Sequence, residues 1–437
     1  MSSARPHVVI IGCGFGGLEA ARTLGDAAVD ITLIDRSNHH LFQPLLYQVA
    51  TAGLSAPSIA APIRHMLRGL RNVTVLMAEV SGIDKSARRV LLADGQQIAY
   101  DHLIVASGAT HSYFGHDDWA EHAPGLKTLA DAFRLRARVL RAFEQAEVLA
   151  TEAERRPWLS FVVIGAGPTG VEMAGTLAEI ARHTLKDEFR RIDPSRAQVL
   201  LLEGSPRVLQ AFRPELSAKA QAQLEGLGVQ VRTSARVVAI DAEGVEVEDE
   251  QGRRSRIPSR TVVWAAGVAA SPLGKTLDVP LDRAGRVVVD GLLNIPGRRE
   301  IYVVGDLAAA QSLEADGTTK PVPGVSPGAK QMGRHAARTL LARIANRPDP
   351  APFRYADYGA LATIGRKAAV ADVGRFQFSG YFAWLFWLFV HIYFLIGFRN
   401  RLVVLMDWAW AYWSFARYAR VVAETADVAP PGADSKT

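Results

Sequence analysis

Cysteine is almost absent from this sequence of 437 residues, in which Cys13 is the single example. One cysteine cannot form an intramolecular disulfide or a redox-active pair of thiols. The sequence therefore excludes a disulfide framework and any chemistry that depends on a dithiol.

Motifs for nucleic-acid binding are also missing, since there is no zinc-ligand spacing, no aromatic RNA platform and no recognition-helix motif. Neither nucleic acid nor a metal is expected as a ligand. Lysine and arginine total 50 against 44 acidic residues, and this net charge of +6 suits an anionic ligand or an anionic lipid surface. The apolar run 8–11 is short and ends in glycines, unlike a signal peptide, so the N-terminal part is expected in the cytoplasm.

A pattern typical of dinucleotide binding opens the chain. The apolar strand expected at 7–11 leads into a glycine-rich turn and a helix. Gly12 permits the tight turn, Gly14 lets backbone approach a pyrophosphate, and Gly17 allows helix and strand to pack closely. The helix N-terminus offers free N–H groups to the phosphates. The next strand ends at Asp35, where a carboxylate can accept hydrogen bonds from ribose hydroxyls.

The same pattern recurs further along the chain. An apolar strand at 158–164 precedes Gly165, Gly167 and Gly170, and a later strand ends at Glu203. A third element repeats as well, because 103–108 mirrors 262–267. A single glycine loop can merely turn a strand into a helix, but two copies in register predict two nucleotide sites.

Further segments resemble known flavoproteins. A strand ending at Gly305-Asp306 places a carboxylate where it could hold the ribityl hydroxyls of a flavin. Together with 12–17 and 106–108, it resembles the FAD signatures of flavoprotein reductases with two dinucleotide-binding domains. The segments 38–50, 165–175, 261–268 and 397–410 are similar to the type II, single-subunit NADH:quinone oxidoreductases, and the resemblance covers nearly the whole chain.

This resemblance implies an α/β fold with two Rossmann-like domains, one of them discontinuous, and a C-terminal aromatic helical region that binds the membrane. It also implies electron transfer from NADH through FAD to a membrane quinone, menaquinone or ubiquinone, without proton pumping. The residues expected to contact FAD are Gly12, Gly14, Phe15, Gly16, Gly17, Asp35, Arg36, Ser107, Gly108, Gly305 and Asp306. Those expected to contact NADH are Gly165, Gly167, Thr169, Gly170, Glu203, Ala266 and Gly267.

Two side chains are candidates for catalysis. Glu172 is expected on the first turn of the helix after the second loop, where the resemblance implies proton handling during quinone reduction. The alternative is an acid that only complements the helix dipole. Gln331 is the polar candidate on the quinone side, with a solvent-facing helix glutamine as the alternative. Its helix is expected to run to about residue 344, with Ser326 as N-cap and Pro327 in the first helical position.

Other polar residues have weaker roles in this interpretation. Glu203 favours NADH over NADPH because a carboxylate repels a 2′-phosphate, although Arg207 argues the other way. His39 and His40 could contact FAD but are kept out of the catalytic set, and the segment 42–47 is expected to pack around the flavin.

The C-terminal part contains 23 residues without formal charge, Phe376–Phe398. This length could span a bilayer, but aromatics occur throughout and His391 lies inside, so a segment in the membrane interface is an alternative. Arginines at 399 and 401 suit an anionic leaflet. A buried core or a homodimer interface is the remaining alternative.

The length predicts two or three domains. We expect an FAD domain at 6–125 and 271–346, a connecting helix at 126–157 and an NADH domain between 158 and 270. A membrane-associated region at 350–422 and a disordered tail at 423–437 complete the chain, which is expected on the cytoplasmic face of the cell membrane. Two other functions stay open: a soluble-type reductase of a small redox protein, and an NADH-sensing flavoprotein that binds a partner.

Overall fold

A computed structural model describes residues 5–422, so the tail expected to be disordered lies outside the described residues. The chain forms two compact units. Within the described residues, unit 1 comprises 5–41, Ala60–Ser112 and Val268–Tyr358, and unit 2 comprises Phe42–Ile59, Tyr113–Gly267 and 359–422.

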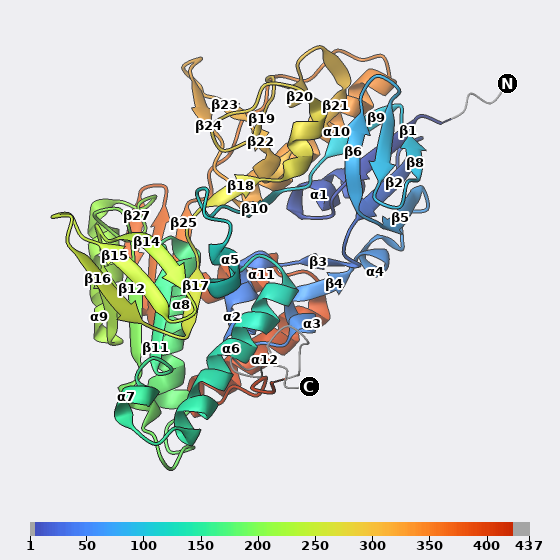
Figure 1. The fold of residues 1–437 in the computed structure, drawn as a ribbon. Helices are drawn as coiled ribbons and strands as arrows, with labels where there is room; N and C mark the ends of the chain where they lie inside the picture. Colours follow the sequence, from blue (N-terminus) through green and yellow to red (C-terminus); the bar gives the residue numbers. More distant parts are fainter. Residues whose placement is uncertain (1–4, 423–437) are drawn as a thin grey trace, which may run out of the picture. The chain divides into compact units, whose positions relative to one another are not determined.

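Unit 1 is built on a six-stranded sheet whose central strands are apolar and buried (Figure 1). Its order is β20 (Asn294–Ile295), β21 (Arg298–Val303), β9 (His102–Val105), β1 (His7–Ile11), β2 (Asp30–Asp35) and β5 (Val73–Met77). All neighbours pair in parallel except β20 with β21. Parallel strands that are covered on both faces have continuous runs of apolar residues in their sequence, and for this reason β1 and β9 could be predicted.

Helices α1 (Phe15–Leu24) and α10 (Ser326–Ile344) lie against each other on unit 1. A Cβ at Gly333 of α10 would lie 2.1 Å from the carbonyl oxygen of Gly16, so glycine lets the two backbones touch. The remaining elements of unit 1 are β3 (His39–Leu41), β4 (Ala60–Pro62), α4 (Ile63–Leu67), β6 (Val80–Asp84), β7 (Arg89–Leu92), β8 (Gln97–Ala99), β10 (Ala109–His111), β18 (Val268–Ala270), β19 (Val287–Val288), β22 (Ala308–Ala309), β23 (Gln311–Leu313), β24 (Thr319–Pro321), and the short 3-10 helices Pro272–Leu277 and Gly305–Leu307.

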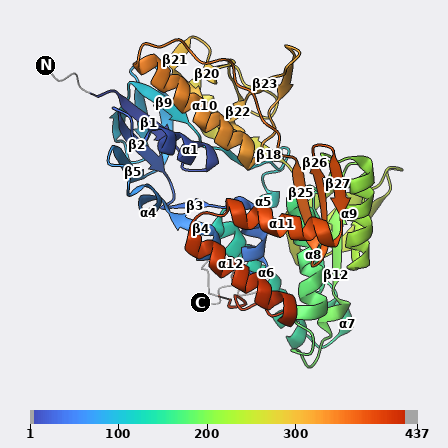
Figure 2. The same ribbon diagram turned by 180° about the vertical axis from the view of Figure 1, so that it is seen from behind.

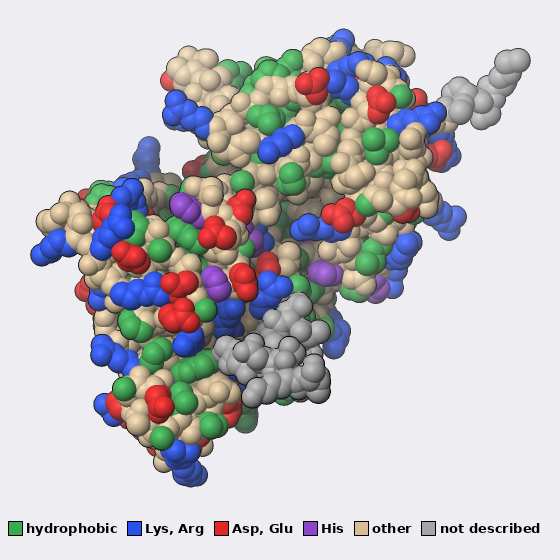
Figure 3. All heavy atoms as spheres, viewed as in Figure 1, with side chains coloured by type: hydrophobic (Ala, Val, Ile, Leu, Met, Phe, Trp, Pro, Cys, Tyr) green, Lys and Arg blue, Asp and Glu red, His purple; other side chains and the backbone are tan. Residues whose placement is uncertain are grey.

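Unit 2 repeats the parallel arrangement with four strands. Their order is β13 (Val229–Arg232), β12 (Gln198–Leu202), β11 (Ser160–Ile164) and β17 (Thr261–Trp264). The antiparallel strands β14 (Arg236–Asp241), β15 (Gly244–Glu248) and β16 (Arg254–Pro258) share an apolar core with this sheet. Basic and acidic side chains are interspersed over β14–β16, as Figure 3 shows, and several form ion pairs there.

Helices surround the second sheet. The segment expected as one connecting helix contains two, and the longer begins at a capping box formed by Thr128 and Asp131. The helices of unit 2 before the C-terminal part are α2 (Leu46–Ala50), α3 (Ala56–Ile59), α5 (Trp119–His122), α6 (Leu129–Val148), α7 (Glu152–Arg155), α8 (Pro168–Glu179) and α9 (Pro214–Gly226), with the short turns Gln43–Leu45, Ile180–Thr184 and Pro194–Arg196.

The C-terminal part consists of a small sheet and two helices (Figure 2). Strands β25 (Ala360–Gly365), β26 (Ala368–Val373) and β27 (Phe376–Ser379) are antiparallel, and α11 (Tyr381–Phe394) and α12 (Phe398–Ser414) follow. The charge-free run Phe376–Phe398 is therefore not one helix, because its first residues form an edge strand and it turns at Gly397, where φ is +86°. Among the residues described, none of the helices combines the length and apolar character needed to cross a bilayer.

Strand β25 lies directly on α8. A Cβ at Gly175 would lie only 1.7 Å from the carbonyl oxygen of Ile364, so the helix surface must be bare backbone at this position. Glycine is unfavourable inside a helix by about 1 kcal/mol relative to alanine, and here the close approach explains its use. The contact fixes β25 beside the helix that carries Glu172.

Replacing Gly175 with alanine should push β25 away from α8. Overpacking of this kind costs about 1–3 kcal/mol, so we expect a lower melting temperature in thermal unfolding followed by circular dichroism. Gly226→Ala is the matched control, because it also lies in a helix but no atom lies within 4 Å of the added Cβ. The control should melt at the wild-type temperature or above it, and equal loss in both variants would contradict the contact.

Candidate functional site

The first glycine loop has the geometry that its sequence predicts. Gly12 has φ of +92°, and a Cβ there would lie 2.5 Å from the carbonyl oxygen of Ala106. A Cβ at Gly17 would lie 1.8 Å from the carbonyl oxygen of Gly12. Gly14, in contrast, has no neighbouring atom within 4 Å of a built Cβ. Its open side at the start of α1 leaves room for a pyrophosphate next to the helix N–H groups.

The second loop repeats this geometry. Gly165 has φ of +96° and lies against Ala266, with 2.7 Å between a built Cβ and the alanine backbone. A Cβ at Gly170 would lie 1.8 Å from the carbonyl oxygen of Gly165, while Gly167 faces open space. Each unit therefore offers one helix N-terminus with a bare backbone approach.

The acid at the tip of the second strand is held in the same way in both copies. Asp35 accepts hydrogen bonds from the backbone N–H groups of Cys13 and Ser37, at 2.6 and 2.7 Å. Glu203 accepts them from Ala166 and Ser205, at 2.7 and 2.9 Å. These bonds fix each carboxylate beside its glycine loop, and each oxygen keeps a second lone pair for a ribose hydroxyl.

Two buried polar atoms in unit 1 suit a flavin nucleotide. The Ser107 hydroxyl and the Nε2 atom of His40 have no hydrogen-bond partner among the described residues. The Nδ1 atom of His40 lies 2.7 Å from the carbonyl oxygen of Cys13, which only accepts, so Nδ1 carries the hydrogen and Nε2 is an acceptor. Burial lowers the pKa of His40 to about 4, so the ring is neutral. The cradle at Gly14 and these unpaired atoms fit FAD, whose hydroxyl and phosphate groups need such partners.

The other predicted FAD residues converge on the same loop. A Cβ at Gly16 would lie 3.2 Å from the carbonyl oxygen of Ala329, and a Cβ at Gly305 would lie 3.5 Å from the side chain of Ala329. The start of α10 is thus held between α1 and the turn that contains Asp306. Arg36 follows β2 and is exposed.

Helix α10 begins one residue earlier than expected. Its N-cap is Val325, in extended conformation, and Ser326 is the first helical residue, so the assignment of Ser326 as N-cap and Pro327 as first helical residue was wrong. The backbone N–H of Ala329 already closes a turn on the carbonyl of Val325, at 3.1 Å. Serine preference alone does not fix a helix start, because backbone geometry at the preceding residue decides it.

Gln331 is held by the chain itself. Its Nε2 donates to the carbonyl oxygen of Ala356 at 2.9 Å, and its Oε1 accepts from the N–H of Ala356 at 2.8 Å. This pair of bonds ties the segment after α10 back to the helix. Both bonds lie at the surface, so a solvent-facing helix glutamine stays an alternative, and a role toward quinone stays a prediction.

Glu172 is the fifth residue of α8, so the expectation that it lies on the first turn was wrong. It is 8% exposed, and burial raises the pKa of its carboxyl group well above the usual value, although a backbone hydrogen bond from Thr363 acts in the opposite direction. A buried neutral acid this far into the helix does not serve to complement the dipole. Burial instead favours the protonated form of the Glu172 carboxyl group.

A pocket of about 350 Å³ lies in unit 2 between α8, β25 and the two C-terminal helices. Its wall is mainly aromatic and aliphatic, with a few polar groups that include Tyr47, Gln48 and Glu179. Such a cavity suits a flat apolar ligand with polar ends. Its lining residues are Tyr47, Gln48, Gly53, Thr176, Glu179, Thr184, Thr363, Gly365, Arg366, Tyr381, Trp384, Leu385, Trp387, Leu388, Leu405, Trp408, Ala409, Ala411, Tyr412, Trp413, Phe415 and Arg417.

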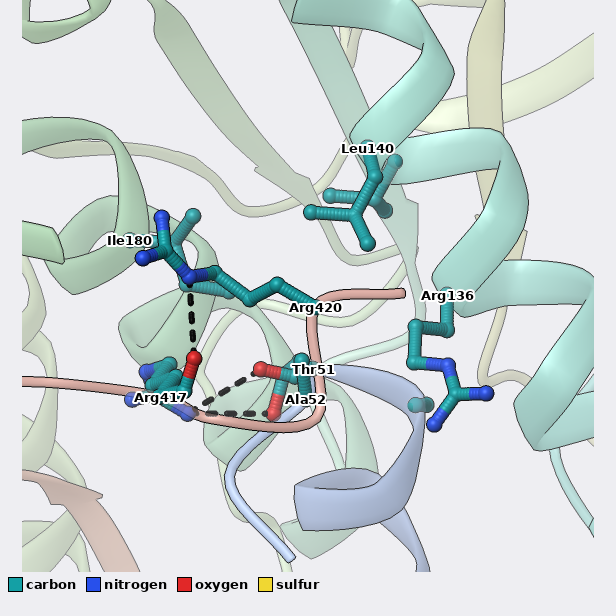
Figure 4. A pocket seen from close by; sticks show the side chains of 9 residues that line it. Thr51, Ala52, Arg136, Leu140, Ile180, Arg417 and Arg420 are labelled. Carbon is teal, nitrogen blue, oxygen red and sulfur yellow. Dashed lines mark hydrogen bonds between the residues drawn. The ribbon is translucent and has the colours of Figure 1, made fainter. Parts of the chain in front are cut away.

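Ionic groups that the sequence did not reveal hold this pocket together. Arg417 pairs with Glu179 at 3.3 Å and donates to the carbonyl oxygen of Thr51 at 3.2 Å. Figure 4 shows this arginine beside Thr51, with Arg420 close by. Arg366 donates to backbone carbonyls at the end of α12 and lies over the ring of Phe415. No motif surrounds these residues, and their partners are distant in sequence.

The outer side of α11 and α12 is apolar and exposed, in contrast to the charged surface over β14–β16. Phe382 is 75% exposed and Trp413 is 79% exposed. Exposed apolar patches of this kind mark contact with a membrane or a protein. The other exposed large side chains of the two helices are Tyr381, Leu385, Phe389, Tyr393, Phe394, Phe398, Leu402, Leu405, Met406 and Trp410.

Comparison with known proteins decides the family. The sequence matches the pyridine nucleotide-disulphide oxidoreductase family over residues 6–333 and the NDH2 C-terminal domain over residues 358–414. It is 48% identical over 424 residues to the type II NADH:quinone oxidoreductase NdhA of Mycobacterium tuberculosis, covering 94% of this chain and 88% of the relative. The chain belongs to the type II NADH:quinone oxidoreductase family.

Other members and solved structures agree with this assignment. The demethylphylloquinone reductase NdbB of Synechocystis is 29% identical, with 93% of this chain and 96% of the relative covered. The structure of NDH2 from Plasmodium falciparum in complex with NADH matches with a TM-score of 0.87 at 20% identity, covering 96% of this chain and all of that one. The sulfide:quinone oxidoreductase of Aquifex aeolicus matches with a TM-score of 0.72 at 22% identity, with coverages of 91% and 92%. The family and the fold class predicted from the sequence are confirmed.

The two glycine loops of this type II oxidoreductase can be tested separately. Gly14→Ala and Gly167→Ala should both fold, since no atom lies within 4 Å of the new methyl group in either case. The first should lose FAD, measured as flavin absorbance per protein. The second should keep FAD and raise the KM for NADH about tenfold, because a misplaced methyl group costs about 1–3 kcal/mol of binding. Loss of FAD from Gly167→Ala alone would reverse the assignment of the loops.

Proposed function

We propose that this chain is a membrane-bound NADH dehydrogenase that transfers a hydride from NADH to FAD and two electrons on to a membrane quinone, without pumping protons. One combination of features supports the proposal. This family member has two matched dinucleotide loops, and it also has an apolar pocket with a buried acid, Glu172, behind the pocket wall. FAD, when bound, supplies the hydride acceptance and electron storage that no side chain here can supply. The protein binds, orients and handles protons.

We assign FAD to the loop of unit 1 and NADH to the loop of unit 2. FAD would be held by Gly12, Gly14, Phe15, Gly16, Gly17, Asp35, Arg36, Ser107, Gly108, Gly305 and Asp306. NADH would be held by Gly165, Gly167, Thr169, Gly170, Glu203, Ala266 and Gly267. The unpaired Ser107 hydroxyl and the His40 acceptor support the assignment of the flavin nucleotide to unit 1.

Glu203 makes NADH the preferred donor. Its carboxylate lies beside the loop that would bind the nucleotide and would repel a 2′-phosphate. Arg207, which could have attracted that phosphate, donates to the backbone carbonyls of Phe212 and Gln210. These bonds hold the guanidinium group and reduce its availability to a 2′-phosphate.

Glu172 would supply a proton to the quinone. Reduction of a quinone to a quinol consumes two electrons and two protons, so the site needs a proton donor that is neutral before the reaction. Burial raises the pKa of Glu172, which favours the protonated form that this role requires. Gln331 would act on the quinone side as a positioning residue, because its amide already binds the backbone of Ala356.

The exposed apolar side of α11 and α12 would lie in the headgroup region of an anionic bilayer, on the cytoplasmic face of the cell membrane. Segments with bulky apolar side chains and nearby arginines bind such surfaces. Arg399 and Arg401 stand at the start of α12. This placement gives a lipid-soluble quinone, either menaquinone or ubiquinone, access to the pocket beside these helices.

Glu172→Gln tests the proposed proton donor. The amide keeps the size of the side chain but has no acidic proton, so quinone reduction should slow about 100-fold, a typical loss for a general acid. Ferricyanide accepts electrons without protons, so NADH:ferricyanide reduction and FAD content should stay near wild type. Glu225→Gln, at an exposed position of α9, is the control. Undiminished quinone reduction by Glu172→Gln would rule out this role.

A variant in which serine replaces Phe382, Phe389, Trp410 and Trp413 together tests the proposed membrane-binding surface. These four side chains are 66–79% exposed, so their loss should not disturb the core. We expect at least a tenfold weaker association with vesicles that contain anionic phospholipid, measured by co-sedimentation. Phe114→Ser, which alters an equally exposed aromatic residue outside α11 and α12, should bind as wild type. Equal sedimentation of both variants would contradict the proposed surface.

A further inference from the structure

Three side chains of the pocket form a continuous hydrogen-bonded series. The indole Nε1 of Trp408, on α12, donates to Oε1 of Gln48 at 2.7 Å. The Nε2 of Gln48 donates to the hydroxyl oxygen of Tyr47 at 2.9 Å. All three residues line the pocket. An indole N–H can only donate, so it fixes the orientation of the Gln48 amide and directs the amide nitrogen at Tyr47.

This arrangement leaves the Tyr47 hydroxyl with a hydrogen to donate. Its oxygen already accepts from Gln48, and within residues 5–422 no hydrogen bond from the hydroxyl itself is recorded. Tyr47 is 5% exposed, and burial raises the pKa of its hydroxyl well above its usual value, so it stays protonated. A buried donor without an acceptor is costly, and a ligand carbonyl in the pocket would satisfy it.

Glu172 lies behind the pocket wall. It does not line the pocket, but Thr176, Thr363 and Tyr47 do. The hydroxyl of Thr176 donates to the backbone carbonyl of Glu172, and the backbone of Thr363 donates to its carboxyl group. Helix α2, which carries Tyr47, packs on α8. A proton that leaves Glu172 for the pocket therefore needs a carrier in the wall.

We propose that the Tyr47 hydroxyl is this carrier: it donates a hydrogen bond to a quinone carbonyl in the pocket and passes a proton from Glu172 to the quinone. The inference rests on the proposed function. As electrons reach the quinone, its carbonyl oxygen takes the hydroxyl proton of Tyr47, and the phenolic oxygen takes the carboxyl proton of Glu172. Glu172 becomes a carboxylate and regains a proton from water. A second passage supplies the second proton of the quinol.

Gln48 and Trp408 are positioning residues in this proposal. Without the indole N–H, the Gln48 amide could rotate and present its oxygen to Tyr47, which would turn the hydroxyl hydrogen toward Gln48 and away from the pocket. Trp408 belongs to the inner side of α12, whereas Trp410 and Trp413 are exposed. The hydroxyl is thus held by the same helix that carries part of the proposed lipid surface.

Anaerobic stopped-flow kinetics of the FAD-loaded protein tests the proposal. The flavin is first reduced with NADH and then mixed with a short-chain menaquinone analogue. Tyr47→Phe, which keeps the ring, should slow flavin reoxidation about 100-fold at saturating quinone. It should also abolish the solvent isotope effect, which is the slowing of flavin reoxidation when water is replaced by deuterated water. Trp408→Phe should slow it about fivefold and add nothing in the Tyr47→Phe background, because the two act through one path.

Two control variants match these changes. Tyr100→Phe removes a buried tyrosine hydroxyl outside the pocket, and Trp158→Phe removes an indole N–H far along the chain from α12. Both should reoxidise at the wild-type rate. The rate of flavin reduction by NADH in the same experiment identifies a variant that is generally damaged. If Tyr47→Phe is damaged in this way, Trp408→Phe still tests the hydrogen-bonded series of Trp408, Gln48 and Tyr47.

The outcomes distinguish failure of the proposed function from failure of the proposed role of Tyr47. If the wild-type flavin is not reoxidised by quinone, the proposed function itself fails. If wild type reacts rapidly and Tyr47→Phe reacts equally fast, Tyr47 is not the carrier. If Tyr47→Phe needs more quinone but reaches the wild-type rate at saturation, the hydroxyl only binds the quinone, and proton transfer through it is overturned. Additive effects of the two substitutions would also overturn the single path.

Discussion

This structure depends on backbone contacts at glycine. At each of them a helix touches another segment without any side chain between the two. Gly17 and Gly170 bring α1 and α8 against the carbonyls of their own loops, and Gly175 brings β25 onto α8. A Cβ at any of these positions would lie within 2 Å of an oxygen atom. The first two contacts orient the helix N-termini at which we propose that the nucleotide phosphates bind, and the third places Thr363 beside the buried acid.

The parts of the fold that depend on local sequence could be predicted. The two dinucleotide units were visible because their glycines, buried strands and terminal acids recur in a fixed order. Boundaries were predicted less accurately: α10 starts at Ser326 rather than after it, and Glu172 is a turn further into α8 than expected. The charge-free run Phe376–Phe398 did not separate a strand from a helix, because the strand has only four residues, and its alternation of Phe with Gln and Ser is too short to stand out from the apolar residues that follow.

Residues of the site could be predicted from the sequence only where they belong to one local motif. Glu172 and the loop residues belong to recognisable segments, whereas Trp408 and Gln48 lie 360 positions apart and Arg417 and Glu179 lie 238 apart. Nothing in the local sequence of Arg417 or Trp408 indicates a partner. The pocket arises when the last helices fold over α8 and α2, so its polar groups become visible only in three dimensions.

The paired hydrogen bonds on Asp35 and Glu203 have a consequence for turnover. Because backbone N–H groups already hold each carboxylate, the loops need no nucleotide to keep their shape. A pyridine nucleotide that binds there as proposed would enter a cradle that is ready to receive it, and little binding energy would be spent on ordering the chain. The same pair of backbone bonds occurs in both units, so one local architecture prepares both loops before either dinucleotide arrives.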